Sequence, residues 1–397
     1  MSKVTICIPV YRASSFLHQT LSHLLKQTYR DIRIDLAIEP EGEDEARICE
    51  RFSDDGRVHY RVNDRVLGWA ENIAAMLRRV SSPFFLVLPH DDFLHPRYVE
   101  WLLPVVEADP RVVSAYGDIQ FLNAARPTRR SQILDEGPVA ERLISFLAAG
   151  GEAPPWRGLT RSEVLTASAF PVDAFRGFLV ECEWAFHLLT QGIARHVPRT
   201  LYFKRLHADG RVTASVARNR VDLSVQRAGL EDHRLRLRRR AAAALPVSPQ
   251  LQLVEAGIDA VAALRFLSGR LGPGEVVEEQ LRRALAICDH HSEVSGAIRI
   301  RSLAHVALAH FHAQNGRDPK AALEAAERAV AADPGSPLAL QVLARQRLDA
   351  GDAFGALVAN AALGDVAPWF MDSDALQAAA EAAFQQTLSG PAEGGRL

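Results

Sequence analysis

The stretch PFFLVLPHDDFLHP, residues 83–96, runs from five apolar residues directly into a proline, a histidine and two adjacent aspartates. The apolar run has the length of a buried strand, and a helical pattern begins beside Pro96. A carboxylate at the end of a buried strand is costly unless water, a metal ion or a partner group receives it. The stretch therefore predicts either a polar turn at the edge of a sheet or a functional site.

Apolar runs of strand length alternate with helical patterns over the first 125 residues. This alternation predicts an α/β fold with a mostly parallel sheet and helices on both faces. Either Ser14 or Ser15 is expected to cap the first helix. Ligands of such sheets bind beyond the carboxyl ends of the strands, where HDD would lie. The expected strands are 4–10, 31–40, 58–62, 83–89 and 111–122, and the expected helices are 14–29, 68–80 and 95–110.

The composition shifts to Ala, Leu, Arg and Glu after about residue 215, with helical periodicity to the end. We therefore expect two domains, 1–215 and 216–397, the second all-α. Gly316 and Gly351 each precede an Asp and an Ala/Leu-rich helix. Over about residues 299–365 this spacing resembles that of tetratricopeptide units, which repeat every 34 residues. A generic helical bundle fits the pattern equally well. Such helices are expected to bind a protein partner or a second copy of the chain.

Composition excludes some classes of protein. Hydrophobic and charged contents of 48% and 24% are those of an ordinary globular protein, and the formal net charge of −2 argues against nucleic-acid binding. The four cysteines have no CxxC spacing, which indicates a reduced, cytoplasmic protein. We expect no signal peptide and no membrane span. The basic run 233–240 fits either a solvated helix face or contact with the inner face of a membrane.

Asp91 and Asp92 offer hard oxygen ligands, which suit Mg²⁺ or Mn²⁺ and leave positions for phosphate oxygens. The alternative is that Asp92 caps the helix that follows.

Four segments together resemble the family 2 glycosyltransferases of the GT-A fold, across about residues 3–215. The first segment, 4–38, is similar to the family's opening strand, Pro-x-Tyr turn and helix ending in Gln-Thr-Tyr. The second, 63–77, looks like its Asn-x-x-x-Gly-x-x-x-Asn helix start. HDD stands where the family has a metal-binding Asp-x-Asp, and 201–215 resembles its closing Arg-x-His segment.

The resemblance implies a role for each matching residue. Pro9 and Tyr11 would line the base pocket, and Glu39 would contact the base or ribose. Gly68 and Asn72 would bring a helix start close to the donor. The diphosphate and metal end would be formed by His90, Asp91, Asp92, Arg205 and His207, with Asp91 and His207 as the metal ligands.

This sequence departs from the family pattern at three places. Pro89 replaces the first Asp of Asp-x-Asp, so one contact is missing unless His90 substitutes. EPEG at 39–42 replaces the usual Asp-Asp-Gly-Ser, and Glu71 stands where an Arg is common. These changes bear on the identity of the nucleotide more than on the fold.

A transferase acting by direct displacement needs a base for the acceptor hydroxyl. Glu181 and Glu183 stand ahead of an amphipathic helix, where the family carries its base. We take Glu181 as the first candidate for the base and Glu183 as the alternative. The residue that is not the base would be an acidic side chain in the first turn, which interacts favourably with the helix dipole. Trp156 fits equally a sugar-stacking role and an anchor of its loop to the core.

The resemblance implies a metal-dependent, inverting transfer of a sugar from a nucleotide-sugar to an acceptor hydroxyl. The acceptor would be a glycan, a lipid-linked saccharide or a protein. A second hypothesis is a catalytically weak or silent GT-A domain that acts as a scaffold, with the helical tail binding a partner. A nucleotidyltransferase ranks below both, because PVYRASS, residues 9–15, has no glycine for a triphosphate loop.

Overall fold

A computed structural model describes most of the chain, which folds as two compact units. The first unit comprises Met1–Leu143 and Glu152–Arg240, and the second Ile144–Gly151 and Ala241–Leu397. The expected domain boundary at 215/216 lies outside the described residues. The described residues are 2–40, 43–122, 128–129, 131, 133–152, 154–166, 170–174, 177–205, 223–268, 274–316, 318–367 and 373–388.

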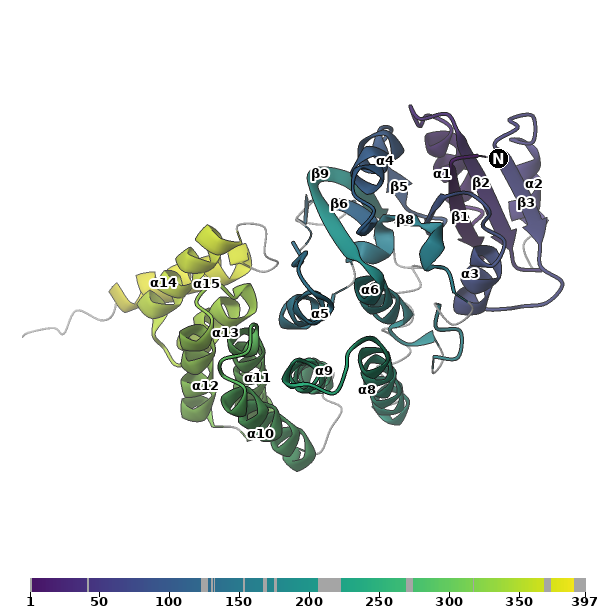
Figure 1. The fold of residues 1–397 in the computed structure, drawn as a ribbon. Coiled ribbons are helices and arrows are strands. Elements are labelled where there is room, and N and C mark those ends of the chain that lie inside the picture. The colour runs from purple at the N-terminus through teal and green to yellow at the C-terminus, as the bar shows by residue number, and fades with distance from the viewer. Residues whose placement is uncertain are drawn as a thin grey trace, which may run out of the picture. The chain divides into compact units, whose positions relative to one another are not determined.

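The first unit is built around one mixed β-sheet (Figure 1). Its strand order is β3-β2-β1-β4-β8-β6-β9-β5, with β7 paired to β6. All five strands expected from apolar runs are present. The strands are β1 (Val4–Val10), β2 (Ile32–Ile38), β3 (Val58–Val62), β4 (Phe84–Val87), β5 (Phe93–Leu94), β6 (Val112–Leu122), β7 (Thr128–Arg129), β8 (Leu159–Arg161) and β9 (Ile193–Arg205).

The parallel part of this sheet is the half that carries the predicted strand ends. Strands β3, β2, β1 and β4 all pair in parallel, so their carboxyl ends meet at one edge. The three-residue β8 enters antiparallel between β4 and β6, and the two-residue β5 pairs antiparallel with β9. The α/β class is confirmed, and short antiparallel strands make the sheet more mixed than expected.

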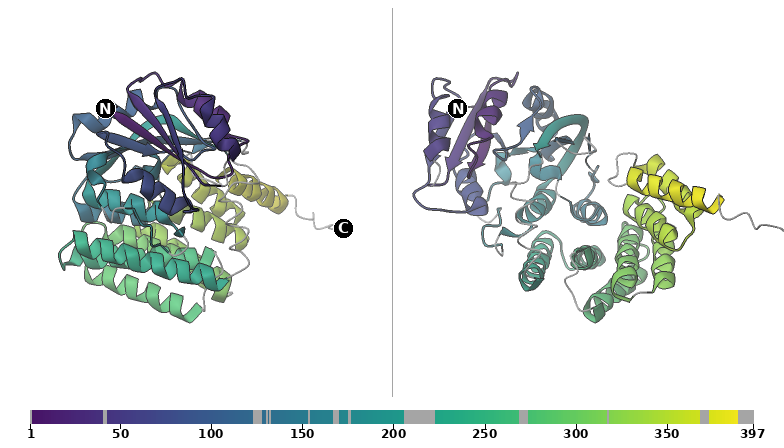
Figure 2. Two further views of the ribbon diagram at one scale, coloured as in Figure 1. Left: turned by 90° about the vertical axis from the view of Figure 1, so that its right-hand side faces the viewer. Right: turned by 180° about the vertical axis from the view of Figure 1, so that it is seen from behind.

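Helices cover both faces of the sheet (Figure 2). On one face, Val4, Ile6 and Ile8 of β1 pack against α1 and α4, because alternate residues of a strand share a face. On the other face, Cys7 packs with α3 and α6. The helices of this unit are α1 (Leu17–Leu24), α2 (Glu43–Glu50), α3 (Trp69–Leu77), α4 (Tyr98–Ala108), α5 (Val139–Ala148), η1 (Pro154–Arg157), η2 (Ser162–Val164), α6 (Val180–Gln191) and α8 (Leu223–Ala244), of which α5 and α8 continue into the second unit.

The expected serine cap of α1 is wrong. The helix begins after Phe16 with no side-chain cap. Instead, Glu45 of α2 accepts hydrogen bonds from the backbone amides of Ala13 (2.6 Å) and Ser14 (3.0 Å). A buried carboxylate from another helix thus satisfies two backbone amides of the turn that precedes α1.

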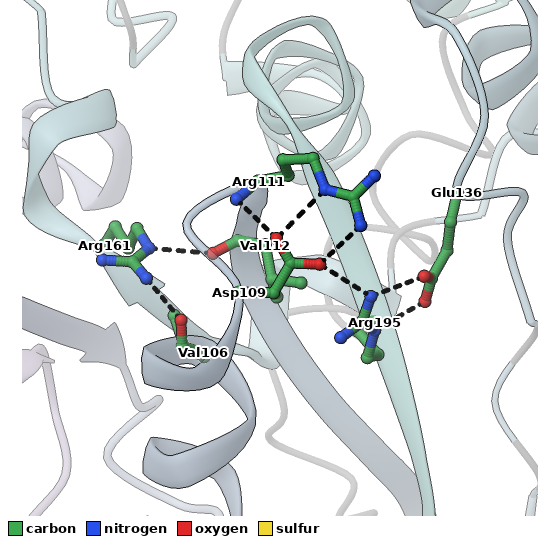
Figure 3. A network of polar contacts seen from close by, with 7 residues as sticks. All are labelled: Val106, Asp109, Arg111, Val112, Glu136, Arg161 and Arg195. Atoms are coloured by element: carbon green, nitrogen blue, oxygen red, sulfur yellow. Dashed lines mark hydrogen bonds and ion pairs between the residues drawn. The ribbon is translucent and has the colours of Figure 1, made fainter.

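A network of charged side chains ties the starts of β6 and β9 together (Figure 3). Asp109 accepts hydrogen bonds from Arg111 (Nη2, 2.9 Å) and Arg195 (3.3 Å), and these guanidinium groups lower its pKa. Arg195 also binds both oxygens of Glu136, at 2.7 and 2.6 Å, and Arg161 donates to backbone carbonyls of α4 and β6. This network lies where β6 and β9 begin, while the residues described below gather where they end.

The second unit is all-helical in its described part, as predicted. Asp318, Ser336 and Asp352 cap α12, α13 and α14 through side-chain hydrogen bonds to backbone amides. Asp318 and Asp352 are 34 positions apart, the period of a tetratricopeptide unit; membership of that class stays a prediction. The helices are α9 (Pro249–Ser268), α10 (Gly274–His290), α11 (Ala297–Phe311), the π-helix η4 (His312–Gly316), α12 (Pro319–Ala332), α13 (Pro337–Asp349), α14 (Ala353–Val366) and α15 (Ser373–Leu388).

Two expectations about the whole chain concern its cysteines and its hydropathy. Cys7, Cys49, Cys182 and Cys288 are all buried free thiols. Within the described ranges, no helix has both the length and the apolar character needed to cross a bilayer.

Candidate functional site

The sequence-predicted residues near the ends of β1 and β2 lie at the carboxyl edge of the parallel strands. Pro9 is the penultimate residue of β1, and Tyr11 follows the strand with 44% of its surface exposed. The Arg12 guanidinium lies over the Tyr11 ring, 5.1 Å from its centroid. The amide of Glu39 donates to the carbonyl of Val10, which brings the ends of β1 and β2 side by side.

Glu39 is only 2% exposed, an unusual position for a carboxylate. Its Oε2 accepts a 3.0 Å hydrogen bond from the amide of Leu67. Its Oε1 is also buried but makes no hydrogen bond to the described part of the protein. A buried acceptor without a donor is costly, so this oxygen suits a ligand that brings a hydroxyl or N–H group.

Gly68 and Asn72 open helix α3 beside this edge. Gly68 has φ 73° and ψ 164°, a conformation that is essentially limited to glycine, although a Cβ there would have space. The Asn72 amide group donates to the carbonyl of Ala37 (3.0 Å), and its oxygen accepts from Asn63 (3.1 Å). Both polar atoms of the buried Asn72 are thus engaged in positioning the end of β2.

The HDD turn follows β4 at the same edge. The Nδ1 atom of His90 lies 3.2 Å from the carbonyl oxygen of Pro9, so the turn is tied to the end of β1. Asp91 is partly exposed, whereas Asp92 is only 2% exposed. The two adjacent aspartates therefore have different environments.

Asp92 is held by strand β9. Tyr202 donates a 2.6 Å hydrogen bond to its Oδ2, and the backbone amide of Arg205 donates a 3.0 Å bond to its Oδ1. Burial and the neighbouring charge of Asp91 nevertheless raise the pKa of Asp92. The helix-cap alternative for Asp92 is wrong, because α4 begins after Arg97 and both carboxylate oxygens of Asp92 bind β9.

The Arg205 side chain lies between two aromatic rings. Its guanidinium is 4.6 Å from the ring centroids of both Phe16 and Phe93, and it donates a 2.9 Å hydrogen bond to Gln19. These contacts join the end of β9 to the start of α1.

Lys204 and Arg157 belong to this neighbourhood although neither was identified from the sequence. Burial and the charge of Arg157 lower the pKa of Lys204, against the charges of Asp92, Glu181 and Asp91. The Arg157 guanidinium lies 5.2 Å above the Tyr202 ring, and its buried Nε makes no hydrogen bond to the described residues. No motif marks either residue; the only sequence signal is strand alternation, which puts Lys204 on the same face as Tyr202.

The two candidate bases at the start of α6 differ sharply. Glu181 is partly exposed and makes no hydrogen bond within the described structure, and its charge acts on Lys204. Glu183 is 2% exposed and accepts a 2.7 Å hydrogen bond from Nε of Arg240 in α8. Burial raises the pKa of Glu183. Of the two, Glu181 has the position expected of a group that meets a substrate.

Trp156 is a core residue and does not present its ring to a ligand. It is 6% exposed and packs edge-on against Trp69, with ring centroids 6.3 Å apart, and beside Phe170 at 6.1 Å. Of its two expected roles, the structure supports the anchor.

His207, the second expected metal ligand, lies outside the described residues. Among the described residues, no cluster of three or more His, Cys, Asp or Glu side chains is arranged to hold a metal ion. Asp91 still fits a divalent cation, because Mg²⁺ is commonly held by one or two carboxylates, substrate phosphates and water.

A family model described as "Glycosyl transferase family 2" matches residues 5–181, which include the ends of β1, β2 and β4 but not β9. Two relatives from Streptococcus pneumoniae serotype 4 each match part of this chain. The glycosyltransferase GlyA is 29% identical over 102 residues, 25% of this chain and 14% of its own length. The glycosyltransferase GlyG is 26% identical over 112 residues, 28% of this chain and 37% of its own length. The chain therefore spans well under half of these relatives.

Solved structures of S. aureus TarS residues 1–349 share the fold. One matches with a TM-score of 0.51 and 13% identity, covering 87% of this chain and 92% of that one. A second, in complex with UDP-GlcNAc, matches with the same TM-score and 14% identity. Both likenesses extend into the helical unit and show a GT-A-like fold, whereas the glycosyl transferase family 2 model matches residues 5–181.

Proposed function

We propose that this glycosyl transferase family 2 domain transfers a sugar from a nucleotide-sugar to an acceptor hydroxyl, with inversion and in one displacement. The observation that supports it most directly is the position of Lys204, on which the charges of both Asp91 and Glu181 act. Asp91 stands at the donor end in the family pattern, and Glu181 stands where the family carries its base. Their common influence on one side chain supports the assignment of these two residues, 90 positions apart, to one site.

The nucleoside would bind at the ends of β1 and β2. Glu39 Oε1, buried and without a hydrogen bond, would accept from a ribose hydroxyl or a base N–H. Tyr11, exposed beside Pro9, would contact the base. TarS, which has the same fold, has been crystallised with UDP-GlcNAc, so UDP-GlcNAc is the first donor to test.

Asp91 would hold a divalent cation, Mn²⁺ or Mg²⁺, with His207 as the second ligand. Bound there, the ion would neutralise charge on the diphosphate as a Lewis acid. Asp92 would have a positioning role, because its hydrogen bonds with Tyr202 and Arg205 hold the turn that carries Asp91.

Glu181 would take the proton of the acceptor hydroxyl. As the acceptor oxygen forms its bond to the anomeric carbon, the bond from that carbon to the diphosphate oxygen breaks on the opposite side. A carboxylate that is partly exposed, and makes no hydrogen bond within the described structure, is available for this proton. The acceptor, whether a glycan, a lipid-linked saccharide or a protein, would approach from the Glu181 side.

The domain division at 215/216 and a role for the helical region in binding a protein partner or forming a homodimer also belong to this proposal. Helices capped at a 34-residue spacing support the second point, because helical repeats present extended binding surfaces.

Calorimetric titration tests the function. UDP, GDP and dTDP would each be titrated with Mn²⁺ and with EDTA into wild type and Asp91→Asn. We expect one nucleotide to bind with micromolar affinity, and both EDTA and the substitution to weaken that binding strongly. Asp54→Asn, at an exposed aspartate, is the matched control and should bind as wild type does. Absence of binding by all three nucleotides to the folded protein would favour the scaffold hypothesis.

A further inference from the structure

Lysine is rare in this chain, which makes the position of Lys204 informative. Only four of its 46 lysine and arginine residues are lysines: Lys3, Lys26, Lys204 and Lys320. Lys3 forms an ion pair with Glu107, and Lys26 and Lys320 are exposed. Lys204 alone is half-buried at the candidate site.

Strand geometry puts Lys204 on the face of β9 that carries Tyr202, the partner of the buried Asp92. Lys204 pairs with Phe121 of β6 in the sheet, and its ammonium lies 5.9 Å from the centroid of that ring. The neighbouring Arg205 points to the opposite face, where it meets Phe16 and Phe93.

Two cations at this place form no ion pair in the described part of the chain, although the charge of Asp92 acts on both. Lys204 forms no ion pair or hydrogen bond there, although the charges of three carboxylates act on it. Arg157 acts on Lys204 with a like charge, and its buried Nε makes no hydrogen bond. A buried donor and a half-buried ammonium are both costly without acceptors, and neighbouring like charges add to that cost. Such an arrangement is most stable when an anion binds to it.

We propose that Lys204 and Arg157 bind the diphosphate of the nucleotide-sugar and stabilise it as the leaving group. This inference rests on the proposed function. When the bond between the anomeric carbon and the diphosphate oxygen breaks, its electron pair stays on that oxygen. The ammonium of Lys204, a compact point charge, and the guanidinium of Arg157 would offset the added negative charge.

The departure from the family pattern fits this assignment. Pro89 stands where the family has the first Asp of Asp-x-Asp, so the described site has one carboxylate fewer around the diphosphate. Both oxygens of Asp92 bind β9, which leaves Asp91 as the carboxylate of this turn that fits an ion. Lys204 and Arg157 would therefore neutralise diphosphate charge that, in the family pattern, is neutralised by a metal ion held with the help of a second carboxylate.

Lysine labelling of the wild-type chain tests the proposal without any substitution. The protein would be acetylated with a trace of an amine-reactive ester, with UDP and Mn²⁺, with uridine and Mn²⁺, or with Mn²⁺ alone, and the four lysines quantified by mass spectrometry. At a UDP concentration about ten times its Kd, mass action predicts about tenfold protection of a lysine that UDP covers. We expect that protection at Lys204 only, and none from uridine, which lacks phosphate. If another nucleotide binds in the calorimetric titration, its diphosphate and nucleoside replace UDP and uridine.

Substitution provides an independent measurement. Lys204→Gln and Arg157→Gln should each weaken binding of the nucleoside diphosphate about 10–100-fold, the range for a hydrogen bond to a charged group. Binding of the nucleoside alone should change little, and Lys320→Gln should leave both affinities unchanged.

The outcomes separate the two proposals. If wild type binds a nucleoside diphosphate but Lys204 reacts equally with and without it, this inference is wrong and the transferase function stands. If wild type binds none of the three nucleoside diphosphates, both are wrong.

Discussion

Arg240 Nε donates a 2.7 Å hydrogen bond to Oε1 of Glu183, joining α8 to the first turn of α6. The second oxygen of Glu183 lies 4.0 Å from Arg236. Glu181, two positions earlier, points away from this pair, because residues i and i+2 of a helix do not face each other. A structural acid and a candidate base are therefore separated by a single residue.

Glu181→Gln should lower the transfer rate about 10²–10⁴-fold, the usual contribution of a general base, while nucleotide affinity stays near that of wild type. Single-turnover transfer and calorimetric titration measure the two quantities. Glu183→Gln is the matched variant: it should retain nucleotide binding and lower the free energy of unfolding by about 1–3 kcal/mol, because it weakens a buried charged hydrogen bond. The reverse pattern, with Glu183→Gln stable but inactive, would exchange the two assignments.

His187 should make the first unit less stable in acid. Burial and the charge of Arg240 lower the pKa of His187 to about 4, from 6.5. The unfolded chain therefore binds a proton between pH 6.5 and 4 that the folded chain does not, and stability falls as pH falls through this window. The full effect is about 3 kcal/mol.

Urea unfolding of wild type and His187→Gln at pH 7 and pH 4.5 measures this effect. The raised pKa of Glu183 acts in the opposite direction, so the difference between the two proteins isolates His187. Equal loss of stability on acidification in both would refute the assignment.

Gly68→Ala should lower the free energy of unfolding by about 1–3 kcal/mol, because φ 73° with ψ 164° is strained for any residue with a Cβ. No steric clash contributes, since a Cβ at Gly68 would meet no atom within 4 Å. Gly56 has the same free space without a positive φ, so Gly56→Ala is expected to change stability by less than about 0.5 kcal/mol. Denaturant titration compares the two, and similar losses in both would argue against strain at Gly68.

Tyr202→Phe should lower the free energy of unfolding by about 1–3 kcal/mol, because it removes one of the two hydrogen bonds to the buried Asp92. It should also weaken nucleotide binding that depends on Asp91, since Asp92 holds the same turn. Tyr60→Phe is the control: its hydroxyl lies 3.4 Å from the side chain of Glu50 in an exposed contact, and little loss is expected. Thermal unfolding and nucleotide titration of both variants are the measurements. If Tyr202→Phe changes neither stability nor nucleotide affinity, Asp92 does not hold the turn in place.

Strands β1 and β4 were predictable because each is a continuous apolar run that a parallel sheet buries on both faces. Strands β2 and β3 mix apolar with polar residues and were predictable from their length and β-branched content. The short β8 was not predictable: three residues, Leu159–Arg161, carry no period, and only pairing with β4 and β6 makes them a strand. Tertiary contacts likewise fix the turn before α1, where Glu45, 31 positions or more away, binds the amides of Ala13 and Ser14, and the helix has no serine cap.

Within the site, the sequence identified residues that occur in motifs and missed those defined by their neighbours. Nothing local marks Lys204 or Arg157, because their significance comes from Asp92 and Glu181, which the fold alone brings near. The difference between Glu181 and Glu183 also depended on Arg240, which contacts only one of them.

The turn after β1 has a further consequence, for how readily its ligand preference can change. Glu45 fixes the amides of Ala13 and Ser14, so the path of this backbone does not depend on the side chain of Tyr11. Tyr11 is exposed, and a substitution there leaves the core intact. On the proposed contact of Tyr11 with the base, evolution or an engineer can therefore vary this position to favour a different base at little risk to folding, and base preference would be separable from the stability of the sheet.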